Sequence, residues 1–269
     1  MTEERNDVKI PASPKQPYDR EAAEKVLRVA RSYLDRADRL VYSFGSRTFL
    51  SGYDVCGADG RGFIDCSTFI VLVLAGIPYE ESPYASGTAE GLRARPGFGA
   101  DAGHKGYSVL FDFSDLPEKF IGIAERIGRP YLEGPKGLDL KKAAELGIGM
   151  DTLREEIRAA GGGRRSEQLA RYFLEQGACF SDPACREPGD LAFYLSSGKF
   201  TEGEMSFPAE RQVNHVGIVS EETGLMINST GLSGDGAPWK NAGLPGVSVT
   251  SVFHEREPAF FARPRYGAV

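Results

Sequence analysis

Residues 213–229 read VNHVGIVSEETGLMINS, two short apolar runs separated by residues typical of a turn. The runs at 213–220 and 225–229 are rich in β-branched residues and predict an antiparallel hairpin. If an even-numbered loop closes the hairpin, residue 221 pairs with residue 224 and His215 faces Thr230. Asn228 is then a diagonal neighbour of His215 on the same face, within reach of a side-chain hydrogen bond. An odd-numbered loop would place Asn228 on the opposite face.

Short strand-like runs continue on both sides of this hairpin, at 191–195, 247–253 and 259–263. Helical patterns come earlier in the chain. Apolar residues recur with helical spacing from Asp19, a plausible N-cap, to Leu40. A buried helix is predicted to start at Asp65 or Cys66 and to end before Gly76 and Pro78, and another is predicted at 166–176 with Ser166 as its cap. Helices followed by antiparallel strands indicate an α+β fold with a sheet of about five to six strands.

The chain has 269 residues, which favours one domain with elaborations. Residues 1–17 are polar, contain three prolines and predict an extended arm. Residues 18–269 are expected to form a single catalytic domain. An insertion at about 81–163, where Gly and Pro break up the local patterns, interrupts it.

The formal net charge is -6 and the sequence pI is about 5.3, with no long basic run. This charge argues against nucleic acid as the main partner and gives no attraction to anionic membranes. No stretch approaches the roughly 18 apolar residues that span a bilayer. The N-terminus lacks the pattern of a signal peptide. The protein is therefore cytoplasmic if this N-terminus is native, and exported if a signal peptide was removed.

The chain contains four cysteines and three histidines. Four cysteines are too few for a disulfide scaffold at this length. Cys179 and Cys185 flank a turn-forming segment and are either a disulfide, in an oxidising compartment, or two unpaired thiols. With so few histidines and no zinc-type spacing, we expect neither a metal site nor a cofactor.

A cysteine becomes a strong nucleophile when its pKa falls, and a helix N-terminus lowers that pKa by stabilising the thiolate. Cys66 lies where the buried helix is predicted to begin; the alternative is a small core residue. Such a thiol needs a histidine base and a group that orients the ring. Compared with His104 in a Gly-rich segment and His254 among charged residues, His215 has the more rigid setting. Asn228 is the candidate orienting group, or otherwise simply the end of a strand.

Four sequence blocks in this order resemble the NlpC-type cysteine peptidases, a family of papain-like cell-wall endopeptidases. They are Tyr-Ser-Phe-Gly-Ser at 42–46, Asp-Cys-Ser-Thr-Phe at 65–69, Pro-Gly-Asp-Leu-Ala-Phe-Tyr at 188–194, and His-Val-Gly-Ile-Val at 215–219 followed by Met-Ile-Asn at 226–228. The first three blocks correspond to the family patterns Tyr-x-Trp-Gly-Gly, Asp-Cys-Ser-Gly-Leu and Pro-Gly-Asp-Leu-Val-Phe-Phe. The fourth block resembles the strand that carries the family's base histidine, followed by the strand that carries its third, polar catalytic residue. The blocks cover half to two thirds of the chain and leave the insertion unmatched.

The resemblance implies a papain-like fold in which Cys66 is the nucleophile, His215 the general base and Asn228 the orienting group. It also implies that Tyr42, Asp65 and Ser67 bind the substrate or frame the site, although a core role for Tyr42 remains open. The implied activity is hydrolysis of amide bonds in small peptides, such as peptidoglycan stem peptides. An amidase, deamidase or acyltransferase of the same superfamily, or a non-catalytic binding protein on this scaffold, are the alternatives. The sequence leaves the oligomeric state open.

Overall fold

The structure is a computed structural model that describes residues 10–42, 56, 59–86, 165–195, 213–231, 246–253 and 257–265. Most of the predicted insertion at 81–163, residues 1–9 of the predicted arm, and the segments that carry His104 and His254 lie outside the described residues.

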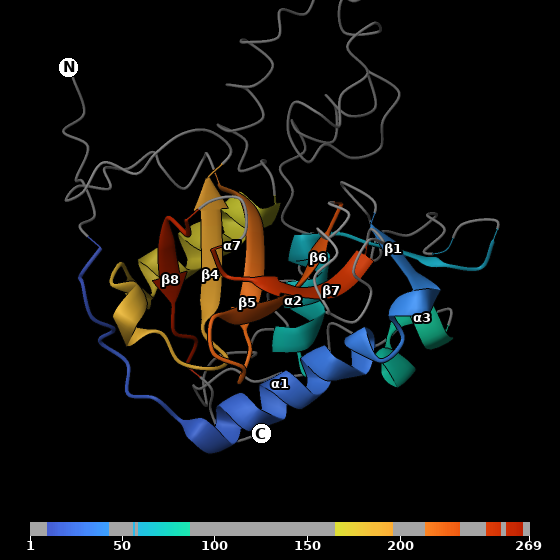
Figure 1. Cartoon of the computed structure of the whole chain (residues 1–269), viewed down its shortest axis with the longest axis horizontal. Coiled ribbons are helices and arrows are strands. Elements are labelled where there is room, and N and C mark those ends of the chain that lie inside the picture. Colours follow the sequence, from blue (N-terminus) through green and yellow to red (C-terminus); the bar gives the residue numbers. More distant parts are fainter. Residues whose placement is uncertain are drawn as a thin grey trace, which may run out of the picture.

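An antiparallel sheet of six strands dominates the described structure (Figure 1). Its spatial order is β3-β8-β4-β5-β6-β7, and each neighbouring pair is antiparallel. The strands are β3 (Cys179–Phe180), β4 (Leu191–Leu195), β5 (Val213–Val219), β6 (Leu225–Thr230), β7 (Gly246–Ser251) and β8 (Phe260–Ala262). The prediction of an α+β fold with a sheet of this size is confirmed. Strand β3 was not predicted, nor was a separate parallel pair formed by β1 (Leu40–Tyr42) and β2 (Gly62–Ile64).

The described α-helices are α1 (Arg20–Leu34), α2 (Cys66–Leu74), α3 (Pro83–Ser86) and α7 (Arg165–Glu175). Short 3₁₀ turns form η1 (Ala37–Arg39), η2 (Tyr79–Glu81) and η6 (Pro183–Cys185). Asp19 caps α1 as predicted, accepting a hydrogen bond from the Ala22 N–H at 3.0 Å. The prediction that the helical spacing continues to Leu40 is wrong, because α1 ends at Leu34. Ala37 and Leu40 prolong the apolar pattern because η1 and β1 also turn them into the core.

The prediction that Ser166 caps α7 is also wrong. The helix begins one residue earlier, and the Ser166 hydroxyl instead donates to the main-chain oxygen of Val213 at 2.9 Å. Ser166 is buried, so this bond links the first turn of α7 to the start of β5 inside the protein.

The two faces of the sheet carry separate apolar clusters. Helices α1, α2 and α7 pack against one face, where their side chains join those of Phe193, Val216, Ile218 and Ile227 in the main core. The opposite face carries a smaller cluster, against which Cys185 of η6 packs. Its members are Phe180, Ala192, Tyr194, Val219, Met226, Val252 and Phe261. Side chains alternate between these faces along each strand, so neighbouring residues in β5 belong to different environments.

Residues 10–12 of the predicted arm run against the domain. The main-chain oxygens of Pro11 and Ala12 accept hydrogen bonds at 2.9 Å from the N–H groups of Ser181 and Asp182. Ile10 packs against the main core. This part of the arm is therefore bound to the segment between β3 and η6.

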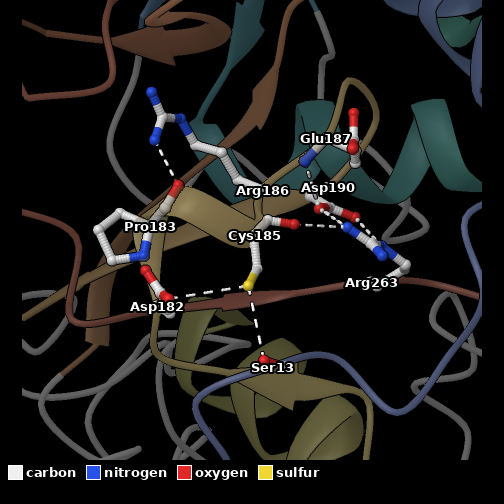
Figure 2. A network of polar contacts seen from close by, with 8 residues as sticks. All are labelled: Ser13, Asp182, Pro183, Cys185, Arg186, Glu187, Asp190 and Arg263. Carbon is white, nitrogen blue, oxygen red and sulfur yellow. Dashed lines mark hydrogen bonds and ion pairs between the residues drawn. The ribbon is translucent and has the colours of Figure 1, made fainter.

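A buried ion pair joins the start of β4 to the end of β8 (Figure 2). Arg263 donates from Nε to Asp190 Oδ1 at 3.0 Å, and from Nη2 to Asp190 Oδ2 at 2.9 Å and to the Cys185 oxygen at 2.8 Å. The N–H of Glu187 also donates to Asp190 Oδ2, at 2.8 Å. Burial raises the pKa of Asp190 to about 6, while the Arg263 guanidinium opposes this rise. The pair fixes β4 and β8 where both adjoin η6.

Candidate active site

The N-terminus of α2 is built around Asp65. Asp65 is the N-cap, and its Oδ1 accepts hydrogen bonds from the Thr68 N–H at 2.7 Å and from the Ser67 hydroxyl at 2.8 Å. The helix begins at Cys66. A helix start carries unpaired N–H groups and a partial positive charge, and both favour an anion at this position.

The far end of α2 is also fixed by its sequence. Gly76 has a φ of 68°, and its N–H bonds to the Val73 oxygen while the Ile77 N–H bonds to the Leu72 oxygen. This is a Schellman motif, for which glycine is favoured because of its positive φ. Every residue of α2 is buried, so the helix holds Cys66 on a rigid support.

Cys66 lies beside the start of β5. Its side chain is 5% exposed, and Sγ is 4.0 Å from the main-chain oxygen of Asn214. Asn214 immediately precedes His215, so the fold brings the candidate nucleophile next to the strand of the candidate base. Cys66 also belongs to the main core cluster. The thiol therefore lies at the border between packed hydrocarbon and the polar start of β5.

A bulge interrupts β5 at this point. Tyr194 pairs with His215 and Leu195 with Val213, which leaves Asn214 outside the ladder. Val213 and Val216 both enter the main core although they are three residues apart, an odd spacing that regular alternation forbids. Asn214 and His215 between them are half-buried. The ring of His215 lies against Tyr194, with centroids 5.5 Å apart.

The register of the β5–β6 hairpin follows the prediction for an even-numbered loop. Ile218 pairs with Ile227 and Val219 with Met226. His215 and Asn228 meet as predicted, with Nε2 of the ring 3.1 Å from Oδ1 of the amide. On the other side of the amide, Nδ2 donates to the Thr250 hydroxyl at 2.8 Å.

This arrangement defines which ring nitrogen can act as a base. With Asn228 Oδ1 as the acceptor, Nε2 of a neutral His215 ring carries the hydrogen. The lone pair is then on Nδ1, which is the nitrogen able to take up a proton.

Gly217 gives Asn228 its space. A Cβ at position 217 would lie 2.6 Å from Met226 Sδ and 3.1 Å from Asn228 Cβ. At both distances the neighbouring side chain would have to move. Gly217 therefore lets Met226 and Asn228 of β6 lie against β5 on the same face of the sheet.

The three predicted substrate-binding residues have different surroundings. Asp65 and Ser67 are both buried and bond to each other within the cap of α2. Tyr42 ends β1 and is half-buried, with its ring over Gly231, where an added Cβ would lie 2.8 Å from Tyr42 Cδ1. Tyr42 thus lies at the end of β6, the strand that carries Asn228.

Sequence reasoning missed Thr250, Tyr194 and Asn214. Thr250 is a diagonal neighbour of Asn228, because Asn228 pairs with Ser248. Residues 231–245 separate these two strands, so no tight turn gives this register from the sequence. The bulge that sets Asn214 apart has no signature in the sequence. Among the described residues, Oδ1 of Asn214 is one of the buried side-chain atoms that have no hydrogen-bond partner.

Cys179 and Cys185 are not joined in a disulfide. Cys179 lies in the core, and desolvation raises the pKa of its thiol. Cys185 Sγ lies 3.6 Å from the Ser13 hydroxyl and 3.8 Å from Asp182 Oδ2 (Figure 2). These two thiols therefore belong to different environments.

Within the ranges that the structure describes, no three His, Cys, Asp or Glu side chains gather in a way that would hold a metal ion. None of the helices in these ranges combines the length and apolar character needed to cross a bilayer.

No protein-family model matches the sequence, and neither the curated proteins nor the solved structures include a match.

Proposed function

We propose that this protein is a cysteine hydrolase with an NlpC-type, papain-like catalytic domain. Cys66 is the nucleophile, His215 the base and Asn228 the group that orients the ring. The observation that carries the proposal is the 3.1 Å contact between His215 Nε2 and Asn228 Oδ1. It occurs on the strand whose preceding residue contacts the Cys66 sulfur at the N-terminus of α2.

The chemistry has two halves. In the first, the thiol proton passes to Nδ1 of His215, and Sγ forms a bond to the carbonyl carbon of the amide. The Cys66 N–H, at the helix start, donates to the resulting oxyanion. The imidazolium then gives its proton to the amide nitrogen as the C–N bond breaks, which leaves a thioester on Cys66. In the second half, His215 removes a proton from water, the hydroxide attacks the thioester, and Cys66 recovers its proton as the acid leaves.

The proposed substrate is a small peptide of the bacterial cell wall, cut next to an amino acid of D configuration. This assignment comes from the resemblance of the four sequence blocks to cell-wall endopeptidases. The Cys66 thiol chemistry also serves amidases, deamidases and acyltransferases, so the products identify the reaction class.

Two measurements test the proposal. Limiting iodoacetamide at pH 6 to 7, followed by peptide mass spectrometry, should label Cys66 faster than Cys56 and Cys185, which serve as internal comparators. Incubation with stem peptides should then release a fragment with a new amine terminus, and Cys66→Ala should abolish its release. A mass gain on an added amine acceptor would identify an acyltransferase instead. If wild type and Cys66→Ala give the same products, Cys66 is not the nucleophile.

A further inference from the structure

Thr250 lies directly behind the Asn228 amide, on the neighbouring strand β7. Its hydroxyl accepts a hydrogen bond of 2.8 Å from Asn228 Nδ2. The exposed fraction is 1% for Asn228 and 8% for Thr250, so both groups are removed from solvent. The register of β6 and β7 pairs Met226 with Thr250 and Asn228 with Ser248, which makes the Asn228–Thr250 contact a diagonal one across the ladder.

A buried asparagine amide can be turned about its last bond, which exchanges the positions of oxygen and nitrogen. One orientation presents Oδ1 to His215 and Nδ2 to Thr250, as in this structure. The other would present N–H groups to Nε2 and would require the hydrogen of a neutral ring to lie on Nδ1. Only the first orientation leaves the Nδ1 lone pair for proton transfer.

We propose that Thr250 is a positioning residue of the site, acting through Asn228. Its hydroxyl accepts the Nδ2 hydrogen and so fixes the position of the Asn228 amide, with Oδ1 held within hydrogen-bond distance of Nε2 of His215. The side chains of Thr250, Asn228 and His215 then form one hydrogen-bonded chain across β7, β6 and β5. The inference rests on the proposed function, because it concerns the group that orients the catalytic base.

Substitution of Thr250 by valine or serine tests this role. Valine has nearly the same shape but offers the Asn228 amide neither a donor nor an acceptor, so the amide loses the contact that holds it against His215. We expect Thr250→Val to lower the rate of peptide hydrolysis by about 10-fold to 100-fold, the usual effect of losing a group that orients a ligand or base. Thr250→Ser retains the hydroxyl and should keep most of the wild-type rate. Thr223→Val, in the exposed turn of the β5–β6 hairpin, is the matched control.

The pH dependence of Cys66 alkylation separates positioning from a purely structural role. A loosely held imidazolium stabilises the thiolate less, so the alkylation rate of Cys66 should rise at a higher pH in Thr250→Val than in wild type. In Thr250→Ser it should rise at the same pH as in wild type. A purely structural role would lower the thermal midpoint and leave this profile in place. Such a result would overturn the inference.

The ring tautomer provides a test that does not depend on the folding of a Thr250 variant. ¹⁵N NMR of Cys66→Ala, recorded where the imidazole signals no longer change with rising pH, distinguishes the two nitrogens of the neutral ring. The signal that disappears in Cys66→Ala/His215→Gln belongs to His215. Protonation on Nε2 is expected, and protonation on Nδ1 would overturn the inference.

The two proposals fail in different ways. If wild-type Cys66 reacts no faster than Cys56 and Cys185, the proposed function fails. If Cys66 reacts rapidly but Thr250→Val matches wild type in rate and profile, the inference alone fails.

Discussion

His215 and Asn228 meet across the β5–β6 hairpin, with the ring nitrogen Nε2 3.1 Å from the amide oxygen Oδ1. The contact depends on the four residues between the strands, because the Ser220 N–H bonds to the Leu225 oxygen and so closes a loop of 221–224. A slip of one residue would turn Asn228 to the opposite face of the sheet. The turn therefore determines whether an imidazole and an amide, thirteen residues apart, form a unit.

Replacing His215 by glutamine should slow the alkylation of Cys66 at pH 6 by roughly 10-fold to 100-fold, because the thiolate loses its cationic partner. At pH 10 the wild-type and variant rates should converge, because an ordinary thiol is ionised there. Iodoacetamide labelling of Cys66 from pH 5 to 10 provides the comparison. Cys185 is the internal control, since its labelling profile should be the same in both proteins. Coincident Cys66 profiles would show that His215 does not act on the thiol.

Asn228→Ala should affect both stability and activity. It removes the partner of the buried Thr250 hydroxyl and of His215 Nε2, which should lower the free energy of unfolding by about 1–3 kcal/mol. Asn228→His restores a polar side chain that can hydrogen-bond to the ring and should recover part of the hydrolysis rate. Urea unfolding and product release measure the two effects. Equal hydrolysis by Asn228→Ala and wild type would exclude an orienting role for Asn228.

The extent to which the sequence predicts the site depends on how local each signal is. The start of a helix at Asp65 or Cys66 and the hairpin register for an even-numbered loop follow from residues close together in the chain, and the structure has the helix starting at Cys66 and this register. The bulge at Asn214 arises from pairing with Tyr194 and Leu195, which lie on another strand. The parallel pairing of β1 with β2 and the bond from Ser166 to Val213 are also contacts over long sequence distances. No local pattern of apolar or turn residues encodes such contacts, because they form only when the whole domain packs.

Gly217→Ala should destabilise the protein by about 1–3 kcal/mol, because its Cβ would lie 2.6 Å from Met226 Sδ. The added methyl group also reaches Asn228 Cβ, so the rate of Cys66 alkylation at pH 6 should fall. A double-mutant cycle with Met226→Ala checks this cause. If the clash is responsible, the double variant is destabilised by less than the sum of the two single variants. Additive losses in urea unfolding would point to a different origin.

Two substitutions of Asp65 should distinguish its effect on stability from its effect on substrate binding. Asp65→Asn keeps an oxygen for the Thr68 N–H, whereas Asp65→Ala removes the cap and should cost about 0.5–2 kcal/mol of stability. If the carboxylate also binds a substrate ammonium group, Asp65→Asn should raise KM about 10-fold for a peptide with a free amine. KM for the N-acetylated peptide should stay unchanged. Equal KM values in wild type and Asp65→Asn for both peptides would confine Asp65 to the helix cap.

The Asp190–Arg263 pair predicts a stability change between about pH 4 and 6. Burial raises the pKa of Asp190 to about 6 in the folded protein, and an unfolded aspartate has a pKa of about 3.9. The folded state therefore binds the Asp190 proton more tightly. The stability that this proton contributes is fully present below pH 3.9 and is lost as the pH rises through 6.

Urea unfolding of wild type and Asp190→Asn at pH 4, 5, 6 and 7 measures this contribution as a difference. Asp190→Asn cannot ionise, so it lacks this pH-dependent contribution at every pH. The stability advantage of wild type over this variant should fall by on the order of 2–3 kcal/mol between pH 4 and 7. An advantage that grows over this range would mean that attraction to the Arg263 guanidinium outweighs the desolvation of Asp190. The pKa of Asp190 would then lie below that of an unfolded aspartate, because the charged form is the one that the fold stabilises.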